Sequence, residues 1–260
     1  MRKFTEGVRA KIERKKGGSG MKQEIWHGDC LEVMKNIPDK SVNVVICDLP
    51  YGTTACLWDT IIPFDKLWEQ YDRICKENAA IVLFGQEPFT SVMRMSNISN
   101  WKYDWYWEKE RITNIAQVKK RAGKTVETIS VFYRKQCTYN PQMIKYDGTL
   151  RTNKVKDGKM GKLTDSSEKK VFEYNDTGFR YPTQVLRFQR DCLKSNLHPT
   201  QKPLLLCEYL IKTYTNEGDV VLDNSCGSGT TLLAAKNLNR QFIGIEKEKE
   251  YYDICLERLK

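Results

Sequence analysis

Apolar and polar positions along this chain follow two periods, one typical of strands and one typical of helices. Short, largely β-branched apolar runs predict buried strands, and apolar residues three or four positions apart predict amphipathic helices. Strands that alternate with helices indicate an α/β fold with a mostly parallel, doubly wound sheet. The predicted strands are 42–47, 79–84, 103–107, 129–133, 220–223 and 241–245, and the predicted helices are 63–76, 204–214, 229–238 and 248–259.

Two segments interrupt this pattern. Residues 138–194 are rich in Lys, Gly, Asp, Asn and Thr and have no sustained period, yet they contain isolated aromatic residues that can bury surface. We interpret them as an inserted target-recognition region. Residues 1–20 are basic and end in Gly17-Gly18-Ser19-Gly20, which indicates an appended segment with a Gly/Ser linker. Within that segment, residues 4–15 fit a short basic helix.

Composition narrows the class of protein. The chain has 260 residues, of which 40% are hydrophobic and 29% are charged, as in folded globular domains. It has no apolar run of about 18 residues and no apolar signal segment, so we expect no membrane span and a cytoplasmic location. The nine cysteines include no Cys-x-x-Cys pair, and only His27 and His198 could support them as ligands. We therefore expect reduced cysteines and no metal site.

The formal net charge of +10 is unevenly distributed. Residues 1–20, 102–135 and 145–194 each carry +5, whereas the rest of the chain is mildly acidic. The two internal basic blocks are interleaved with Trp, Tyr and Phe. Such a surface suits a nucleic acid, because phosphates attract Lys and Arg. The alternative is a solvated basic surface without such a partner.

The motif with the most chemical content is Asp48-Leu49-Pro50-Tyr51, directly after the predicted strand 42–47. Open α/β sheets place their reactive groups at this carboxyl edge. There the Asp48 carboxylate and the Leu49 carbonyl can both accept hydrogen bonds from an exocyclic amine, while Tyr51 offers its ring face to a base. Two acceptors outside the ring plane would expose the lone pair of that amine. The alternative for the tetrapeptide alone is a strand followed by a proline turn.

A second predicted strand ends in a carboxylate at Asp223 and leads into a glycine-rich turn. Gly227 and Gly229 permit a tight turn and a close approach of backbone to a ligand at a helix N-terminus. The next strand ends at Glu246, 17 positions after Gly229, where a carboxylate can bind ribose hydroxyls. Asp223 suits a cationic cofactor. The third glycine of a dinucleotide-binding loop is replaced by Leu232.

Together with His198-Pro199-Thr200-Gln201-Lys202-Pro203, these motifs resemble the β-group of DNA amino-methyltransferases, which use S-adenosyl-L-methionine. The resemblance covers nearly all of residues 24–260, and several short sequence segments are similar to those of phage or prophage orphan members. It implies a seven-stranded, mostly parallel Rossmann-like methyltransferase sheet in circularly permuted form. The catalytic half would be residues 21–137 and the cofactor-binding half residues 195–260.

The resemblance also implies roles for individual residues. Asp48 and Leu49 orient the target amine, and Tyr51, after Pro50, stacks on a base flipped out of double-stranded DNA. Aspartate at the first position of this motif goes mostly with adenine, so the implied product is N6-methyladenine at a specific DNA site, and the implied assembly is a homodimer. The residues implied in binding S-adenosyl-L-methionine are Asp29, Lys202, Asp223, Gly227, Gly229 and Glu246.

Two departures from the family pattern leave alternatives open. Leu49 replaces the first proline of the usual Asp-Pro-Pro-Tyr, and Asn224-Ser225-Cys226 replaces the common Pro-Phe-x, so we assign no role to those three residues. An N4-cytosine methyltransferase is the nearest alternative. A methyltransferase for RNA or protein glutamine generally has the cofactor motif first. A non-catalytic DNA-binding subunit would have lost one motif, and a nicotinamide dehydrogenase would keep the third glycine.

Overall fold

The structure of the chain is a computed structural model. The chain divides into two compact units. One contains residues up to Asn140 and from Gln184 onward, and the other contains Pro141–Thr183. No helix among the described residues is both long and apolar enough to cross a membrane. The structure describes residues 8–11, 23–53, 59–148, 153–154, 173–174, 177–191 and 201–260.

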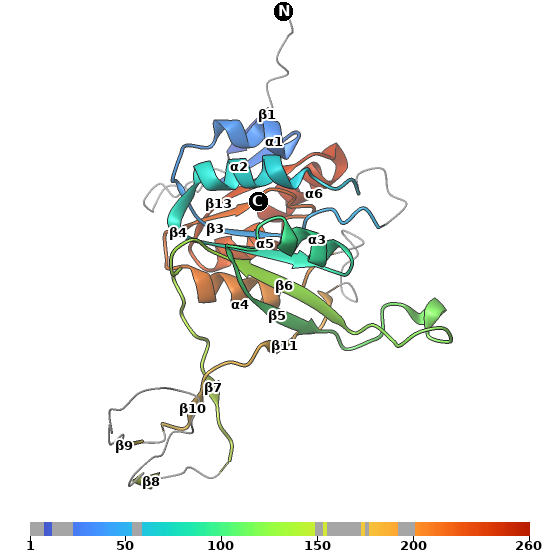
Figure 1. Ribbon diagram of the computed structural model, residues 1–260. Helices are drawn as coiled ribbons and strands as arrows, with labels where there is room; N and C mark the ends of the chain where they lie inside the picture. Colours follow the sequence, from blue (N-terminus) through green and yellow to red (C-terminus); the bar gives the residue numbers. More distant parts are fainter. Residues whose placement is uncertain are drawn as a thin grey trace, which may run out of the picture. The chain divides into compact units, whose positions relative to one another are not determined.

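A nine-stranded sheet forms the larger unit, in the order β1-β2-β13-β12-β3-β4-β6-β5-β11 (Figure 1). The run from β2 to β4 in this order is parallel throughout, whereas β6 is antiparallel to both β4 and β5. The predicted α/β class with a mostly parallel sheet is confirmed. The strands are β1 (Val8–Lys11), β2 (Gln23–His27), β3 (Val42–Cys47), β4 (Cys75–Gly85), β5 (Trp101–Glu108), β6 (Val126–Phe132), β11 (Val185–Arg187), β12 (Val220–Asp223) and β13 (Gln241–Glu246).

The sheet has more strands than the seven that we expected. At one edge β11 pairs in parallel with β5, and at the other β1 pairs antiparallel with β2. Because residues 8–11 form a strand, the basic helix predicted over 4–15 is wrong for these residues. An edge strand offers unpaired backbone groups that another segment can satisfy through its backbone alone. Side-chain periodicity therefore did not reveal this pairing.

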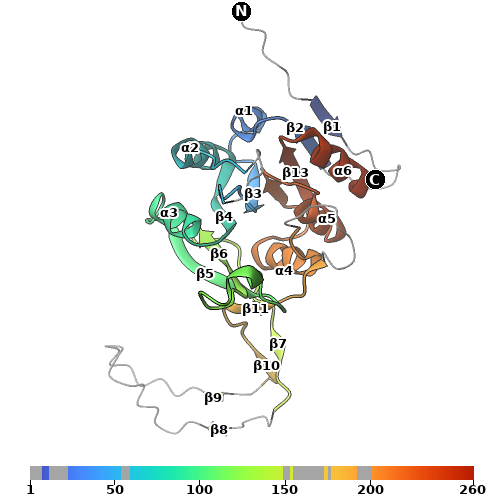
Figure 2. The ribbon, with the colours of Figure 1, turned by 90° about the vertical axis from the view of Figure 1, so that its right-hand side faces the viewer.

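Helices cover both faces of the sheet (Figure 2). Successive strand residues point to opposite faces. Accordingly, Val44 and Ile46 join an apolar cluster with α4, α5 and α6, whereas Val45 and Cys47 join a cluster with α1, α2 and α3. The α-helices are α1 (Cys30–Val33), α2 (Phe64–Ile74), α3 (Phe89–Met95), α4 (Leu204–Tyr214), α5 (Thr230–Asn237) and α6 (Lys249–Leu259), with 3₁₀ turns η1 (Met34–Asn36) and η2 (Ile115–Gln117).

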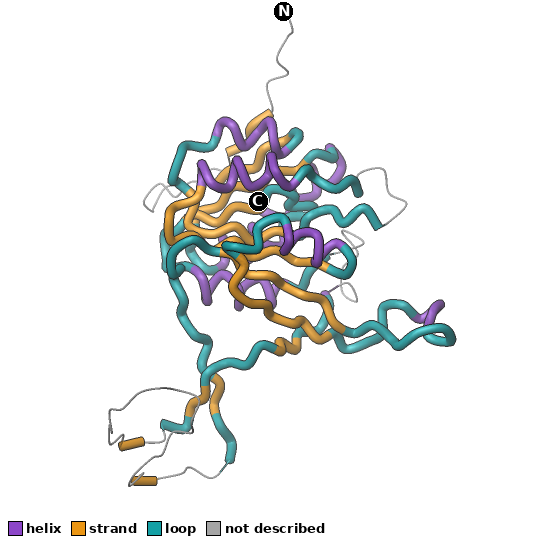
Figure 3. The backbone as a smooth tube through the Cα atoms, viewed as in Figure 1, coloured by secondary structure: helices purple, strands orange, loops and turns teal. Residues whose placement is uncertain are grey.

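The alternation of strands and helices on which the prediction depended is visible along the chain (Figure 3). All six predicted strands and all four predicted helices are present, and α4 matches the predicted range 204–214 at both ends. β4 begins at Cys75 instead of 79, since its first residues include the polar Lys76 and Glu77. The prediction missed β2, α1, α3 and the short strands of the smaller unit, all of which are short and weakly periodic.

The smaller unit contains two short strand pairs. β7 (Ile144–Lys145) pairs antiparallel with β10 (Phe179–Arg180), and β8 (Asn153–Lys154) pairs antiparallel with β9 (Glu173–Tyr174). The Arg180 guanidinium lies 4.1 Å from the centre of the Tyr146 ring. The described part of this unit thus has little regular structure, and the recognition region over 138–194 stays a prediction.

Candidate active site

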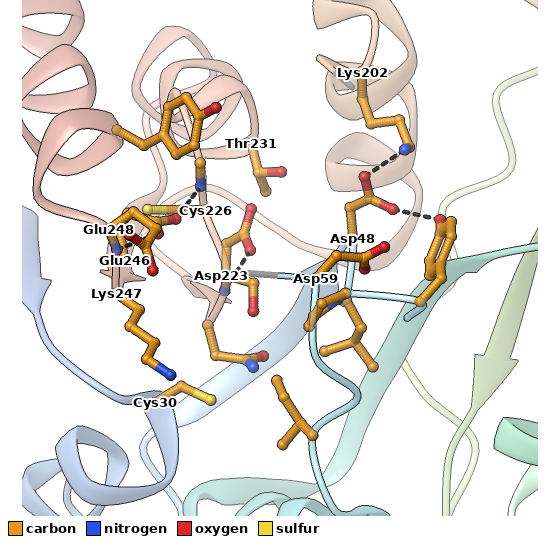
Figure 4. A pocket seen from close by; sticks show the side chains of 18 of the residues that line it. Cys30, Asp48, Asp59, Lys202, Asp223, Cys226, Thr231, Glu246, Lys247 and Glu248 are labelled. Carbon is orange, nitrogen blue, oxygen red and sulfur yellow. Dashed lines mark hydrogen bonds and ion pairs between the residues drawn. The ribbon is translucent and has the colours of Figure 1, made fainter. Parts of the chain in front are cut away.

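A cavity of about 500 Å³ opens at the carboxyl ends of three parallel strands. The strands are neighbours, because β12 pairs with β13 on one side and with β3 on the other. Asp48 follows β3, Asp223 ends β12, and Glu246 ends β13. All three line the cavity, with Asp48 toward one side and Asp223 and Glu246 toward the other (Figure 4). The fold thus brings together motifs that are far apart in the sequence.

Asp48 is a partly buried carboxylate that is held by two neighbours. The Tyr51 hydroxyl donates to its Oδ1 at 2.5 Å, and the Lys202 ammonium donates to its Oδ2. Burial raises the pKa of Asp48, and Lys202 opposes that rise. The charge on this acceptor therefore depends on Lys202.

The rest of this motif shapes the cavity wall. The Tyr51 ring packs against Phe89 with ring centres 4.9 Å apart, and Pro50 lines the cavity. The Leu49 side chain is buried in the apolar core. Among the described residues, no group donates a hydrogen bond to the Leu49 carbonyl. Burial of Leu49 thus anchors the turn where the usual motif has a proline, and its carbonyl is available to a ligand.

Lys202 lies between two carboxylates. Its Nζ contacts Asp48 Oδ2 and lies 3.6 Å from Glu127 Oε2. Burial lowers the pKa of Lys202, both carboxylates raise it, and the net shift is upward. The resemblance implied that Lys202 closes over the cofactor. In the structure its ammonium group is bonded to Asp48.

Glu127 and Lys109 also line the cavity, although sequence reasoning gave neither of them a role. Lys109 Nζ donates to Glu127 Oε1, and Gln86 Nε2 donates to the same oxygen at 2.9 Å. Burial raises the pKa of Glu127, but Lys202 and Lys109 lower it to about 2. A usable signal was present, since Glu127 is the one charged residue in strand β6.

Asp59 was missed as well, and it orders the backbone that follows Tyr51. Its two carboxylate oxygens accept hydrogen bonds from the backbone N–H groups of Gly52 and Thr53, at 2.8 and 2.9 Å. Because these bonds are local to a loop without periodicity, the sequence carried no signal for them.

The side of the cavity near β12 contains two polar groups that face a ligand-sized space. Asp223 is 4% exposed, and burial raises its pKa to about 7. Among the described residues, none of the ion pairs includes Asp223. The adjacent Asn224 accepts a hydrogen bond from the Tyr71 hydroxyl at 2.6 Å, while its buried Nδ2 has no hydrogen-bond partner in the described part of the chain.

Glu246 is tied to the glycine-rich turn. Its Oε2 accepts a hydrogen bond from the Gly227 N–H at 2.8 Å, and its Oε1 accepts one from the Glu248 N–H at 2.8 Å. Gly227 has a φ of 50°, in the left-handed region that favours glycine. A carboxylate oxygen has more than one lone pair, so Glu246 can still accept hydrogen bonds from a ligand in the cavity.

The two remaining predicted cofactor residues differ in position. Asp29 lines the cavity, and its Oδ1 accepts a hydrogen bond from the Leu31 N–H at 3.0 Å, which caps α1. Gly229 does not line the cavity. Its φ is 78°, and a Cβ atom there would lie 2.4 Å from the Sγ atom of Cys255 in α6. Gly229 therefore permits close packing of the turn against α6.

The family model described as DNA methylase (N6_N4_Mtase) matches residues 42–257. The DNA adenine methyltransferase YhdJ of Escherichia coli (strain K12) is 29% identical over 255 residues, which cover 90% of this chain and 82% of that protein. The Type II methyltransferase M.HpaI of Haemophilus parainfluenzae is 27% identical over 252 residues, which cover 92% of this chain and 74% of that protein.

Two solved structures extend the comparison. The crystal structure of the M1.HpyAVI–SAM complex matches with a TM-score of 0.58 and 28% identity, over 90% of this chain and 98% of that chain. The PvuII DNA methyltransferase (cytosine-N4-specific) matches with a TM-score of 0.62 and 19% identity, over 91% of this chain and 86% of that chain. At that identity the second match shows a shared fold only.

Proposed function

The chain belongs to the N6/N4 DNA methylase family, and from this membership we propose that it methylates the exocyclic N6 of an adenine flipped out of double-stranded DNA, at a specific sequence. Its cofactor is S-adenosyl-L-methionine, as in the M1.HpyAVI complex. We place the chain in the circularly permuted β-group. The sheet order supports this, because β12 and β13 come late in the chain yet lie between β2 and β3.

One observation carries the proposal. The Asp48 motif and the residues proposed for the cofactor, Asp223, Gly227 and Glu246, line one cavity at the carboxyl edge of neighbouring strands. A transfer between two small reactants needs both to be held within reach of each other and aligned. A shared cavity can hold both reactants within reach of each other.

The residues present fit a cationic nucleoside cofactor. Asp223 has a raised pKa and no cationic side chain paired with it among the described residues, so a positively charged ligand would stabilise its ionised form. The buried Asn224 Nδ2 offers a donor, and Glu246 offers acceptors for hydroxyl groups. When bound, S-adenosyl-L-methionine supplies a methyl group on a positively charged sulfur, and the protein supplies alignment.

Asp48 and the Leu49 carbonyl are the proposed acceptors for the two amine hydrogens of the target base. Hydrogen bonds from both amine hydrogens to acceptors outside the ring plane favour a tetrahedral nitrogen and expose its lone pair. The nitrogen gains positive charge as the methyl group is transferred, and the ionised Asp48 stabilises that charge. The methylated nitrogen then releases one proton, for which Asp48 is the proposed first acceptor. Tyr51 is the proposed contact for the base ring, and its packing on Phe89 supports this role.

The target amine is reached by base flipping in this proposal. An amine inside a stacked duplex cannot reach Asp48 in a cavity of the protein, so the base must leave the stack at a cost of a few kcal/mol. Adenine is favoured by the aspartate at position 48 and by the relative YhdJ, which is named an adenine methyltransferase.

The test is methylation of plasmid DNA in a host without DNA methylation. Single-molecule sequencing should reveal one recognition sequence, and mass analysis of the digested nucleosides should reveal N6-methyladenine. N4-methylcytosine as the main product would overturn the adenine assignment. Absence of any methylated nucleoside, with cofactor bound normally, would overturn the proposed activity.

A further inference from the structure

The segment that connects β5 to β6, residues 109–125, forms a structured loop, which we call the β5–β6 loop. Backbone hydrogen bonds cross its base, from the Lys109 N–H to the Thr125 carbonyl at 2.7 Å and from the Thr113 N–H to the Lys124 carbonyl at 2.9 Å. Asn114 Oδ1 accepts a hydrogen bond from the Lys124 N–H at 2.6 Å. The loop extends beyond the ends of both strands and carries η2 at its tip (Figure 1).

The tip of this loop exposes apolar surface. Ile115 is 73% exposed and Val118 is 43% exposed. The nearby Ile112 is 40% exposed, although it also packs across the loop onto Gly123, where a Cβ atom would lie 2.7 Å from Ile112 Cδ1. Exposure of an isoleucine at a structured tip costs hydrophobic free energy unless a partner covers it. Ile115 and Val118 thus give the tip an apolar surface that a partner can cover.

Positive charge surrounds this tip. Arg111, Lys119, Lys120 and Arg121 are all exposed. The only acidic residue between 109 and 125 is Glu110, whose Oε1 is bonded to Arg190 Nε at 2.9 Å. A protein partner for such a tip would need an acidic rim around an apolar hollow. Duplex DNA presents phosphates beside stacked apolar bases, so both features of the tip match it.

The loop begins at the proposed active site. Lys109 and Thr113 both line the cavity that contains Asp48, and Thr113 is two positions before Ile115. DNA whose target base enters this cavity must therefore have its emptied stacking position near the loop. A base that leaves the duplex exposes the faces of its stacking neighbours, and an apolar side chain can cover them.

We propose that the β5–β6 loop enters the duplex beside the flipped base, with Ile115 filling the vacated position and Lys119 and Lys120 binding flanking phosphates. This inference rests on the proposed function and adds a DNA contact outside residues 138–194. The tip of the loop then stabilises the extruded state of the base and takes no part in the methyl transfer itself.

Ile115→Ala separates this role from chemistry. On a fully paired duplex that carries the recognition sequence, kcat/KM should fall about tenfold or more, since filling the stack no longer offsets extrusion. On the same duplex with a mismatch opposite the target base, where extrusion costs less, kcat/KM should fall less than threefold. Affinity for S-adenosyl-L-methionine should not change. The matched control is Ile98→Ala. Ile98 is 51% exposed and precedes the first residue of β5, whereas the β5–β6 loop follows the last.

The phosphate contacts have their own measurement. The double variant Lys119→Ala with Lys120→Ala should have a shallower slope of log(kcat/KM) against log[salt]. The magnitude of the slope should fall by roughly 1.8, at about 0.9 for each lost phosphate contact. Lys66→Ala with Lys35→Ala, two exposed lysines outside the loop, is the control pair.

Several outcomes would overturn the inference while leaving the proposed function intact. These are equal losses on paired and mismatched DNA, no loss on either, or a salt dependence that matches that of the control pair. A shift of Ile115→Ala from dimer to monomer in sedimentation, with the paired-to-mismatched ratio unchanged, would assign the tip to a second copy instead. Failure of the unaltered protein to methylate either duplex would refute the proposed function itself.

Discussion

Asp48 and Lys202 dominate the site at the residue scale, because each sets the charge of the other. Burial raises the pKa of Asp48 and lowers that of Lys202, and their mutual attraction opposes both effects. Glu127 lies 3.6 Å from the same ammonium group. The proposed acceptor for the target amine is therefore part of a small network of charges, so a change at one member should alter the others.

Replacing Lys202 with Met should move the acidic limb of the pH profile to higher pH. In the proposed mechanism Asp48 acts as a carboxylate, so activity is lost as the pH falls through its pKa. Lys202 is the largest contribution that lowers this pKa, and its loss raises the pKa further. The measurement is kcat/KM against pH, with thermal unfolding to confirm the fold.

The control is Lys249→Met, which removes an exposed lysine that is bonded to Asp253. An unmoved acidic limb in Lys202→Met would contradict the coupling to Asp48. If the only effect were weaker binding of S-adenosyl-L-methionine, Lys202 would return to the cofactor role that the family resemblance implied.

Asp48→Ala should impair methyl transfer, whereas Glu246→Ala should impair cofactor binding. Asp48→Ala removes the proposed amine acceptor, and turnover should fall by at least about a hundredfold while cofactor affinity changes little. Glu246→Ala removes a charged hydrogen-bond acceptor, and cofactor affinity should fall about tenfold or more. Calorimetry gives the affinities, and transfer of a labelled methyl group gives the turnover. Near-normal turnover in Asp48→Ala would refute its assigned role.

At the element scale, the turn between β12 and α5 determines how closely the proposed cofactor-binding side of the cavity packs against α6. Gly229 is the N-cap of α5 and has a φ of 78°, and its Cα faces Cys255 of α6. Because the turn also contains Gly227, whose N–H binds Glu246, displacement of the turn would alter the cavity wall.

Gly229→Ala should destabilise the protein by about 2 kcal/mol or more, since backbone strain adds to overpacking. The matched control is Gly218→Ala. Gly218 has a similar φ of 82°, but a Cβ atom there meets no atom within 4 Å. The difference in unfolding free energy between the two variants isolates the contact with Cys255. Equal losses would show that strain alone matters at position 229.

At the scale of the whole molecule, residues 1–20 contribute charge and one edge strand, β1. Their removal eliminates five net positive charges and exposes the edge of β2. We expect the recognition sequence and turnover at physiological salt to persist, with weaker non-specific DNA binding and a slightly lower unfolding temperature. Methylated-site sequencing and DNA binding at several salt concentrations check this. A changed recognition sequence would show that the segment takes part in recognition.

The sequence alone determined the fold class, the core strands and helices, and part of the candidate site. The α/β class, the six core strands and the four long helices follow from periodicity, which is a local property that each segment carries by itself. The acidic residues Asp48, Asp223 and Glu246 could be located because they end apolar strands, and parallel neighbours bring such ends to one edge. Resemblance of three motifs then indicated the family before any geometry was known.

Tertiary structure alone decided the contacts that join distant segments. It paired Lys202 with Asp48 and placed Glu127 beside them, although no local pattern links these three positions. It turned Gly229 away from the cavity toward Cys255, and it added β1 and β11 to the sheet edges. The physical reason is the same in each case: periodicity reports which face of an element is buried, whereas packing of the whole chain chooses the partner.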